Sequence, residues 1–108
     1  MSMDKRFVVC HYVELESKLS RNLFNKLYDD LTDKFFIPEG MENIILSNFR
    51  GSRVKSNDSY DAFSFEVTSD LISEKYVQFT HEMKPIINFL EKENIKYTIK
   101  FGCVQYYI

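Results

Sequence analysis

Residues that make a chain flexible are scarce in this sequence, which has 3 glycines and 2 prolines among its 108 residues. Glycine and proline occupy many of the turn positions at which loops change direction, so their scarcity predicts short polar connections rather than long mobile lids. Many enzymes use such a lid to close over a bound substrate. The composition therefore disfavours that class of enzyme.

Cysteine is also rare, and long hydrophobic runs are absent. The cysteines are Cys10 and Cys103, and the apolar run near the N-terminus ends at Glu14, which makes it too short for a signal peptide or a membrane span. A chain of this size can build a core without disulfides, so we expect a cytoplasmic protein with reduced thiols and no membrane partner. A disulfide between the two cysteines is the alternative.

The sequence contains no recognisable metal-binding cluster, phosphate-binding loop or nucleophile motif. Cys10 and His11 are neighbours on a predicted strand, where adjacent residues point to opposite faces, so they cannot act as one catalytic pair. His81 lies on a predicted helix without a second metal ligand at helical spacing. We therefore predict no cofactor, no metal site and no catalytic residue, and we expect that the protein is not an enzyme.

Aromatic residues are abundant, with 10 phenylalanines and 7 tyrosines but no tryptophan. Hydrophobic residues make up 44% of the chain and charged residues 28%, as is typical of globular proteins. This length is enough for one core and too short for two, so we predict a single domain over residues 1–108. The formal net charge of −2 provides no overall attraction to nucleic acid or anionic lipid.

The hydrophobic pattern begins with an apolar run over residues 7–13 that is rich in β-branched residues and predicts a strand. From Ser17 or Ser20 onward the period changes to four, which predicts an amphipathic helix. The stripe consists of Leu19, Leu23, Leu27, Leu31 and Phe35, widened by Phe24 and Tyr28. Residues 37–40 contain a proline and a glycine, so the helix is expected to end there.

Three further strands and a second helix follow along the chain. In order, the predicted elements are a strand over 41–49, a hairpin connection over 50–60, a strand over 62–67, a helix over 69–94 and a strand over 95–107. Pro85 falls inside the helix and removes a backbone hydrogen bond, so we predict a kink or a restart near Lys84. Asn94 tolerates a left-handed conformation and is expected to close the helix.

This order of elements is typical of the α+β class with a ferredoxin-like βαββαβ arrangement. We therefore predict a four-stranded antiparallel sheet with two helices on one face, in which the last strand lies beside the first. The same fold hosts enzymes, metal carriers, RNA-binding modules and regulatory modules, so it does not identify a function.

Three groups of residues are candidates for binding a partner. Alternate residues of the last strand are expected on an open sheet face beside the first strand. The connection over 50–60 carries a basic cluster, expected to be solvated or to contact a partner. The acidic residues of the first helix are expected to form a solvated face, and such a face can also be an interaction surface. The candidates are Tyr12, Lys100, Tyr106 and Tyr107 on the sheet, Arg50, Arg53 and Lys55 in the connection, and Asp29, Asp30 and Asp33 on the helix.

The leading hypothesis is a small cytoplasmic protein-binding module that acts as a stoichiometric inhibitor of a macromolecular partner. Toxin-neutralising immunity proteins and phage-encoded inhibitors of host defence are of this type. The partner would be a toxin, a nuclease or a defence complex. Exposed tyrosines supply contact area at a small entropic cost, and acidic residues steer a basic partner such as a nuclease.

Two alternatives belong to other classes. One is an RNA- or DNA-binding module that uses the sheet face and Arg50, Arg53 and Lys55, although the strand over 62–67 lacks the expected glycine-aromatic run. The other is a dimeric ferredoxin-like protein that binds or converts a small molecule, with His11 or His81 as the acid or base in a pocket. Neither patterning nor charge excludes a homodimer that buries the open sheet face.

Overall fold

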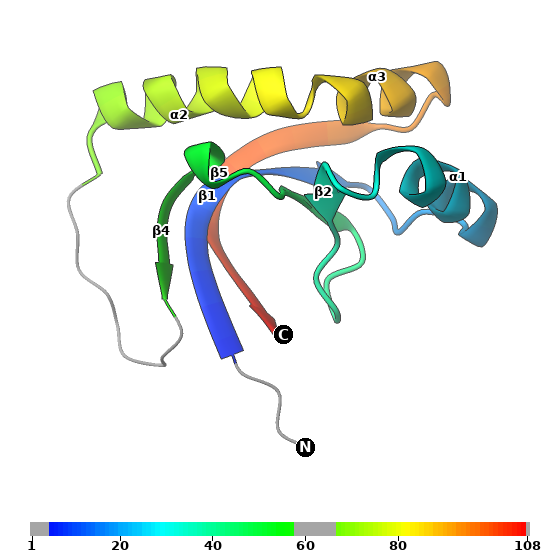
Figure 1. Ribbon diagram of the computed structural model, residues 1–108, viewed down its shortest axis with the longest axis horizontal. Coiled ribbons are helices and arrows are strands. Elements are labelled where there is room, and N and C mark those ends of the chain that lie inside the picture. Colours follow the sequence, from blue (N-terminus) through cyan, green and yellow to red (C-terminus); the bar gives the residue numbers. More distant parts are fainter. Residues whose placement is uncertain (1–4, 58–66, 108) are drawn as a thin grey trace.

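The computed structural model describes residues 5–57 and 67–107, and these residues form three α-helices and a five-stranded antiparallel sheet. The predicted α+β class is therefore confirmed. The elements are β1 (Lys5–Leu15), α1 (Arg21–Leu31), β2 (Phe35–Phe36), β3 (Ile44–Ser47), the 3₁₀ turn η1 (Arg50–Ser52), β4 (Arg53–Asn57), α2 (Ser69–Glu82), α3 (Lys84–Lys92) and β5 (Tyr97–Tyr107). Figure 1 shows α2 and α3 lying end to end above a strongly bent sheet.

β1 is the central strand of the sheet. β5 pairs with it antiparallel along its whole length, from Lys5↔Tyr107 to Leu15↔Tyr97, which confirms that the last strand lies beside the first. On the other side of β1, β3 pairs with its C-terminal part and β4 with its N-terminal part. The two short strands therefore follow each other along one side of β1, separated by η1, and β2 pairs with β3.

The connection predicted over residues 50–60 is wrong for its described part, because residues 50–57 form η1 and β4. β4 occupies the position beside β1 that a ferredoxin-like sheet gives to its third strand. Of the strand predicted over 62–67, residues 62–66 lie outside the described residues. The four-stranded βαββαβ arrangement is therefore not confirmed.

The helix α1 begins where the sequence predicts and ends earlier. Ser20 is the N-cap, and its Oγ accepts a hydrogen bond from the N–H of Leu23 at 3.3 Å. The helix ends at Leu31, whereas the sequence predicted an end in the proline-glycine segment after Phe35. Phe35 instead lies in β2 opposite Ser47 and is 2% exposed. Pairing in a strand buries the Phe35 ring to the same extent as a further helical turn would. The four-residue spacing from Leu31 to Phe35 was therefore not specific to a helix.

The predicted interruption of the second helix is confirmed. α2 and α3 meet at Met83, which is fully buried. Pro85 lies in the first turn of α3. Backbone N–H groups in the first turn have no intrahelical hydrogen-bond partner, so a proline there removes no hydrogen bond from the helix. Thr68 caps the start of α2, and Asn94 after α3 has a φ of 57°, the left-handed conformation expected of it.

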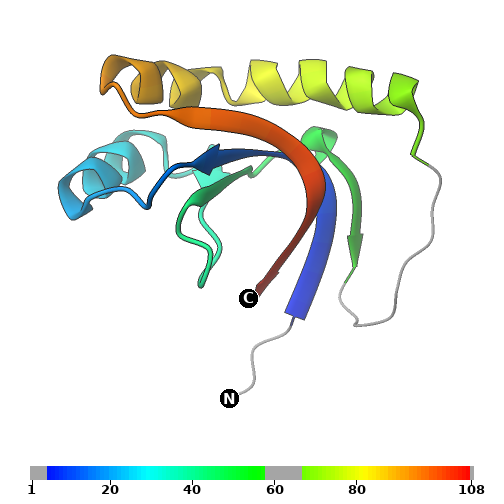
Figure 2. The same cartoon turned by 180° about the vertical axis from the view of Figure 1, so that it is seen from behind.

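Each face of the sheet has its own hydrophobic core. The first core lies between the sheet and the helices, and its buried residues are Val13, Leu15, Leu27, Phe35, Ile45, Phe79, Met83, Ile86 and Leu90. The buried residues of the second core, on the opposite face, are Val8, Cys10, Ile44, Leu46, Val104 and Tyr106. The connection from β2 to β3 lies inside the bend of β1 and β5 (Figures 1 and 2), where Phe36 and Met41 pack against the second core. The sheet face predicted to be open is therefore covered at Val104 and Tyr106, whereas Lys100 on the same face is exposed.

Candidate functional site

A groove runs along α1, between this helix and the segment that leads from β2 into β3. It consists of two adjoining cavities of about 340 Å³ and about 380 Å³, which share Phe24 and Ile37. We refer to it as the α1 groove. Its walls include Arg21, Phe24, Tyr28 and Thr32 on one side and Phe36, Ile37, Glu42 and Asn48 on the other.

Two aromatic side chains one helical turn apart form part of the wall of the α1 groove. Phe24 and Tyr28 are stacked with their ring centroids 5.5 Å apart, and Tyr28 meets the buried ring of Phe35 edge-on at 6.4 Å. Tyr28 nevertheless remains 50% exposed. Because its neighbours already hold the ring in place, a partner that binds it would need to order few additional side chains.

The charges on α1 oppose the helix dipole at both ends. Acidic residues stabilise a helix near its N-terminus and basic residues near its C-terminus. α1 begins with Arg21 and has no acidic residue in its first turn, whereas Asp29 and Asp30 lie in its last turn, which has no basic residue. Each such reversed charge destabilises a helix by about 0.3–1 kcal/mol at low ionic strength. Helix stability therefore does not explain this arrangement.

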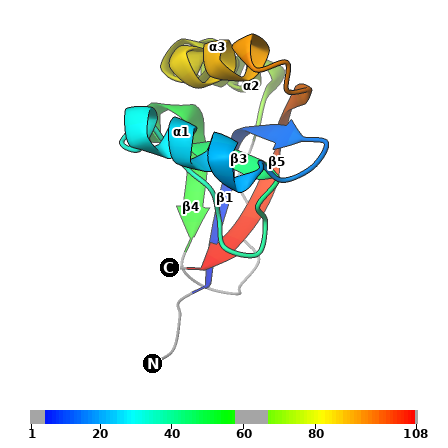
Figure 3. The same ribbon diagram turned by 90° about the vertical axis from the view of Figure 1, so that its right-hand side faces the viewer.

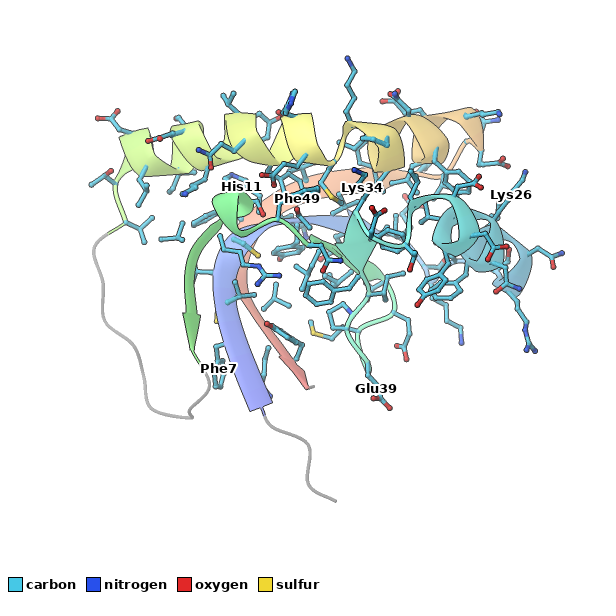
Figure 4. The ribbon with its side chains drawn as sticks, in the orientation of Figure 1. Phe7, His11, Lys26, Lys34, Glu39 and Phe49 are labelled. Carbon is cyan, nitrogen blue, oxygen red and sulfur yellow. The ribbon has the colours of Figure 1, made fainter. Side chains whose placement is uncertain are left out.

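The acidic candidates Asp29, Asp30 and Asp33 are all exposed. Within the described ranges their carboxylates have no hydrogen-bond or ion-pair partner. The nearby Lys26, labelled in Figure 4, is engaged elsewhere, because its Nζ lies 3.0 Å from Oε1 of Glu93. The C-terminal end of α1 is therefore a surface of uncompensated negative charge beside the α1 groove.

The basic candidates do not form one described surface. Arg50 lies in η1 and Lys55 in β4, and the side chains of these two residues and of Tyr107 lie outside the described part of the structure. Arg53 is partly buried. Its guanidinium lies 5.6 Å from the centre of the Phe36 ring, and Nη2 donates to a backbone carbonyl oxygen of β3 at 3.3 Å. Arg53 thus contributes to packing beside the second core.

The sheet candidates Tyr12, Lys100 and Tyr106 share one face, as predicted, but this face is covered at Tyr106. Tyr106 is 6% exposed, and its ring centroid lies 5.4 Å from that of Phe36, so the expectation that it lies on an open surface is wrong. Tyr12 is half-buried against the second core. Lys100 is exposed, and its Nζ lies 2.9 Å from Oε1 of Glu14, a hydrogen bond that raises the pKa of Lys100.

His11 is buried between β1, α2 and β5, with 4% of its surface exposed (Figure 4). Its ring centroid lies 5.4, 5.9 and 4.7 Å from those of Tyr76, Phe79 and Phe101. Burial lowers the pKa of His11, and its Nδ1 has no hydrogen-bond partner among the residues described. His81 is exposed on α2, and neither histidine lines the α1 groove.

The two cysteines are free thiols on opposite faces of the β1–β5 ladder, so the disulfide considered from the sequence does not form. Cys10 belongs to the second core, and burial raises its pKa to about 12, which keeps the thiol protonated and unreactive. Cys103 is exposed opposite Val9, and partial burial raises its pKa as well. No group of three or more His, Cys, Asp or Glu residues in the described ranges is arranged to hold a metal ion.

Sequence reasoning missed the α1 groove. A signal was present in the width of the first helical stripe, because Phe24 and Tyr28 extend it beyond what one helix face can bury. The opposite wall had no such signal. Phe36 and Ile37 were assigned to the end of the helix, whereas they lie in β2 and directly after it.

Within residues 5–57 and 67–107, no helix combines the length and the apolar character needed to cross a bilayer. Comparisons of the chain with protein-family models, with curated proteins and with solved structures returned no match. The α1 groove and the charges beside it are therefore the observations from which a function can be argued.

Proposed function

We propose that the protein is a small binding module that acts as a stoichiometric inhibitor of a macromolecular partner, and that it holds a basic segment of this partner against the α1 groove. The observation that carries the proposal is the reversed charge pattern of α1. Asp29 and Asp30 lie at the helix end that favours cations, and no described residue neutralises them. Residues that break a local stability rule are expected at functional sites.

The aromatic wall of the α1 groove complements this charge. A segment with an apolar side chain next to lysine or arginine would place the apolar group against Phe24 and Tyr28 and its cations near the carboxylates. In such interfaces aromatic anchors provide most of the binding energy. Exposed charges contribute mainly to the association rate and to the choice of partner. The two features together therefore favour a basic protein surface as the ligand.

The alternatives have less support. Nucleic-acid binding on the sheet depends on an open aromatic face, and Phe36 and Met41 pack against the described part of that face. The carboxylates at the end of α1 would also repel phosphates. A small-molecule or catalytic site depends on a histidine in a pocket, and the α1 groove is lined by none.

A preformed surface of this kind suits a protein that works by occupying its partner, as an immunity protein or an anti-defence inhibitor does. The partner would be a toxin, a nuclease or a defence complex with a basic site, and both proteins would meet in the cytoplasm. The ferredoxin-like order of elements is part of the same proposal, and the pairing of β5 with β1 agrees with it.

The test is affinity capture by the tagged full chain from a nuclease-treated host lysate, followed by mass spectrometry. One variant removes the aromatic anchor (Tyr28→Ala), and a second removes the charge (Asp29→Asn, Asp30→Asn and Asp33→Asn together). We expect one protein partner at a stoichiometric yield with the wild-type chain and a clear loss of this partner with both variants.

The control variant removes the same charge from exposed positions that do not line the α1 groove, namely Glu16→Gln, Glu39→Gln and Glu74→Gln. Glu39, for example, extends from the tip of the connection between β2 and β3 (Figure 4). The control should capture the partner as well as the wild-type chain does. Equal recovery by all variants, or a recovery that nuclease treatment abolishes, would contradict the proposal.

A further inference from the structure

β5 is an edge strand of 11 residues, about twice the usual strand length. β1 pairs with one side of it throughout, and no other described strand pairs with the opposite side. Figure 2 shows β5, in orange and red, along the near side of the bent sheet, and Figure 3 shows it on the side of β1 away from β4. Its outer backbone groups are therefore available to another strand.

The hydrogen bonds of β1 identify the outward-facing groups. The N–H of Leu15 donates to the carbonyl oxygen of Asn43 at 2.8 Å, so the backbone of Leu15 points away from its β5 partner Tyr97. Hydrogen-bonded and non-hydrogen-bonded pairs alternate along an antiparallel ladder, and the β1–β5 register is continuous. The residues whose N–H and C=O face the open edge are therefore Tyr97, Ile99, Phe101, Cys103, Gln105 and Tyr107.

This edge lacks the features by which proteins prevent strand addition. Proline, lysine, bulges and covering segments are the usual protection. β5 has no proline and no bulge against β1, and its one charged residue, Lys100, is bound to Glu14 of β1. By contrast, β4 is 5 residues long and carries Arg53 and Lys55. β5 is therefore the described edge best suited to strand pairing.

We infer that β5 pairs with β5 of a second copy of this chain, antiparallel and fully overlapped, so that one continuous sheet runs through a twofold dimer. In this register Gly102 of one copy lies opposite Gly102 of the other at the twofold axis. The residues with outward-facing backbone groups then form the hydrogen-bonded pairs, with Phe101 opposite Cys103. Lys100 lies opposite Val104, so no like charges oppose each other.

A second copy is complementary to this edge. The twofold register uses every outward-facing backbone group of both strands, and it places the single charged residue, Lys100, opposite the uncharged Val104. The pairing also leaves the α1 groove accessible, because β2 and β5 lie on opposite sides of β1 in the order of the sheet. The inference is therefore independent of the proposed function and can fail without it.

The first test is the mass of the full chain in solution, by native mass spectrometry and light scattering. We expect twice the 12.9 kDa of a single chain. Cys103→Pro removes an outward N–H and leaves the bonds to β1, so it should give a monomer, whereas Cys103→Ser should stay dimeric. The double variant Cys103→Lys with Gln105→Lys adds edge charges without constraining the backbone and should also be monomeric.

The second test is a cross-link that reports the register. The Cα atoms of a close antiparallel pair lie about 4.5 Å apart, within the range of a disulfide. A Cβ at Gly102 would approach the Tyr12 ring at 3.8 Å, an ordinary contact, so a side chain fits there. Cys10 lies opposite Gly102 on β1, so the background is Cys10→Ala with Cys103→Ser. In this background Gly102→Cys should form a covalent dimer on mild oxidation, and Gln105→Cys should not.

Three outcomes would overturn the inference. The first is a wild-type chain that is monomeric at all accessible concentrations. The second is a dimer that persists in both Cys103→Pro and the double lysine variant. Circular dichroism must show for this outcome that at least one of the two variants is folded. The third is cross-linking through Gln105→Cys that is as efficient as through Gly102→Cys, because another register would then be present.

Discussion

Replacing His11 with phenylalanine should make the stability of the protein less dependent on pH. The imidazole is 4% exposed and lies among the rings of Tyr76, Phe79 and Phe101. Burial lowers the pKa of His11 from its usual 6.5, because a protonated ring would lose its hydration in this environment. A phenylalanine ring keeps the aromatic contacts and cannot be protonated.

The sign of the effect follows from the lowered pKa of His11. As the pH falls through about 6.5, the unfolded chain takes up a proton that the folded protein resists, so the unfolded state binds more protons. Stability is therefore complete above this pH and decreases as the pH falls toward the lower, folded pKa. The slope for one group is at most about 1.4 kcal/mol per pH unit, which gives an upper bound of about 2 kcal/mol between about pH 7 and about pH 5.

Nδ1 of His11 adds a second contribution. Since no described residue hydrogen-bonds to it, His11→Phe also removes a buried unsatisfied polar atom, a group whose burial costs about 1–3 kcal/mol. We therefore expect His11→Phe to be at least as stable as the wild-type protein at neutral pH. At acidic pH the variant should be clearly more stable.

Urea unfolding followed by circular dichroism at a series of pH values measures both effects. His81→Gln removes the exposed histidine of α2 and serves as the control, which should follow the wild-type pH dependence. Parallel stability curves for the wild-type protein and His11→Phe would refute the reasoning. A large loss of stability of His11→Phe at neutral pH would also refute it, because the ring would then make an interaction that phenylalanine cannot replace.

Three further predictions concern stability and are measured by urea or thermal unfolding. Tyr106→Ala should destabilise the protein by about 3–5 kcal/mol, because it empties the second core, and a small loss would mean that the ring is not buried. Ser20→Ala should cost about 1 kcal/mol through the lost cap of α1, with Ser17→Ala as the neutral control. Asp30→Asn should stabilise α1 by about 0.3–1 kcal/mol while weakening partner capture, and a destabilised variant would show that this carboxylate supports the fold.

Local features of the fold were predictable because they depend on residues close together in the chain. Ser20 and Asn94 occupy cap positions whose preferences are set within one helical turn. Pro85 interrupts its helix because the ring clashes with the preceding turn. The position of β5 beside β1 followed from the order of elements, because the ferredoxin-like arrangement places its last strand beside its first.

Features that depend on distant residues could not be predicted from pattern. Phe35 continues the four-residue stripe of α1, but its pairing with Ser47 puts it in a strand. Residues 50–57 have the composition of a connection, and their described structure includes β4 because β1 offers an edge to which they can bond. The hydrophobic period reports which face a side chain takes within an element, and it does not report the partner of that element.

The candidate site was predicted only in part, because the hydrophobic period shows which face a side chain takes and not what packs against that face. Asp29, Asp30 and Asp33 are exposed as predicted, because charged residues opposite an apolar stripe face solvent in any packing, and their role in binding stays a prediction. Tyr106 was assigned to an open surface because strand alternation shows which residues share a face. Alternation does not show whether a third segment covers that face.

The covered sheet changes where this protein can meet other molecules. Val104 and Tyr106 are buried in the second core and the helices cover the first core, so a large part of each face of the described sheet is covered. A helix surface and a strand edge then remain for contacts, and these differ in kind. The α1 groove offers side chains, which select a partner by shape and charge, whereas the β5 edge offers backbone groups, which are satisfied by any strand of matching register. Selection at such an edge comes from the side chains that flank it. On β5 these side chains are uncharged except for Lys100, which is paired with Glu14. An edge of this composition favours a second copy of the chain over a charged foreign strand.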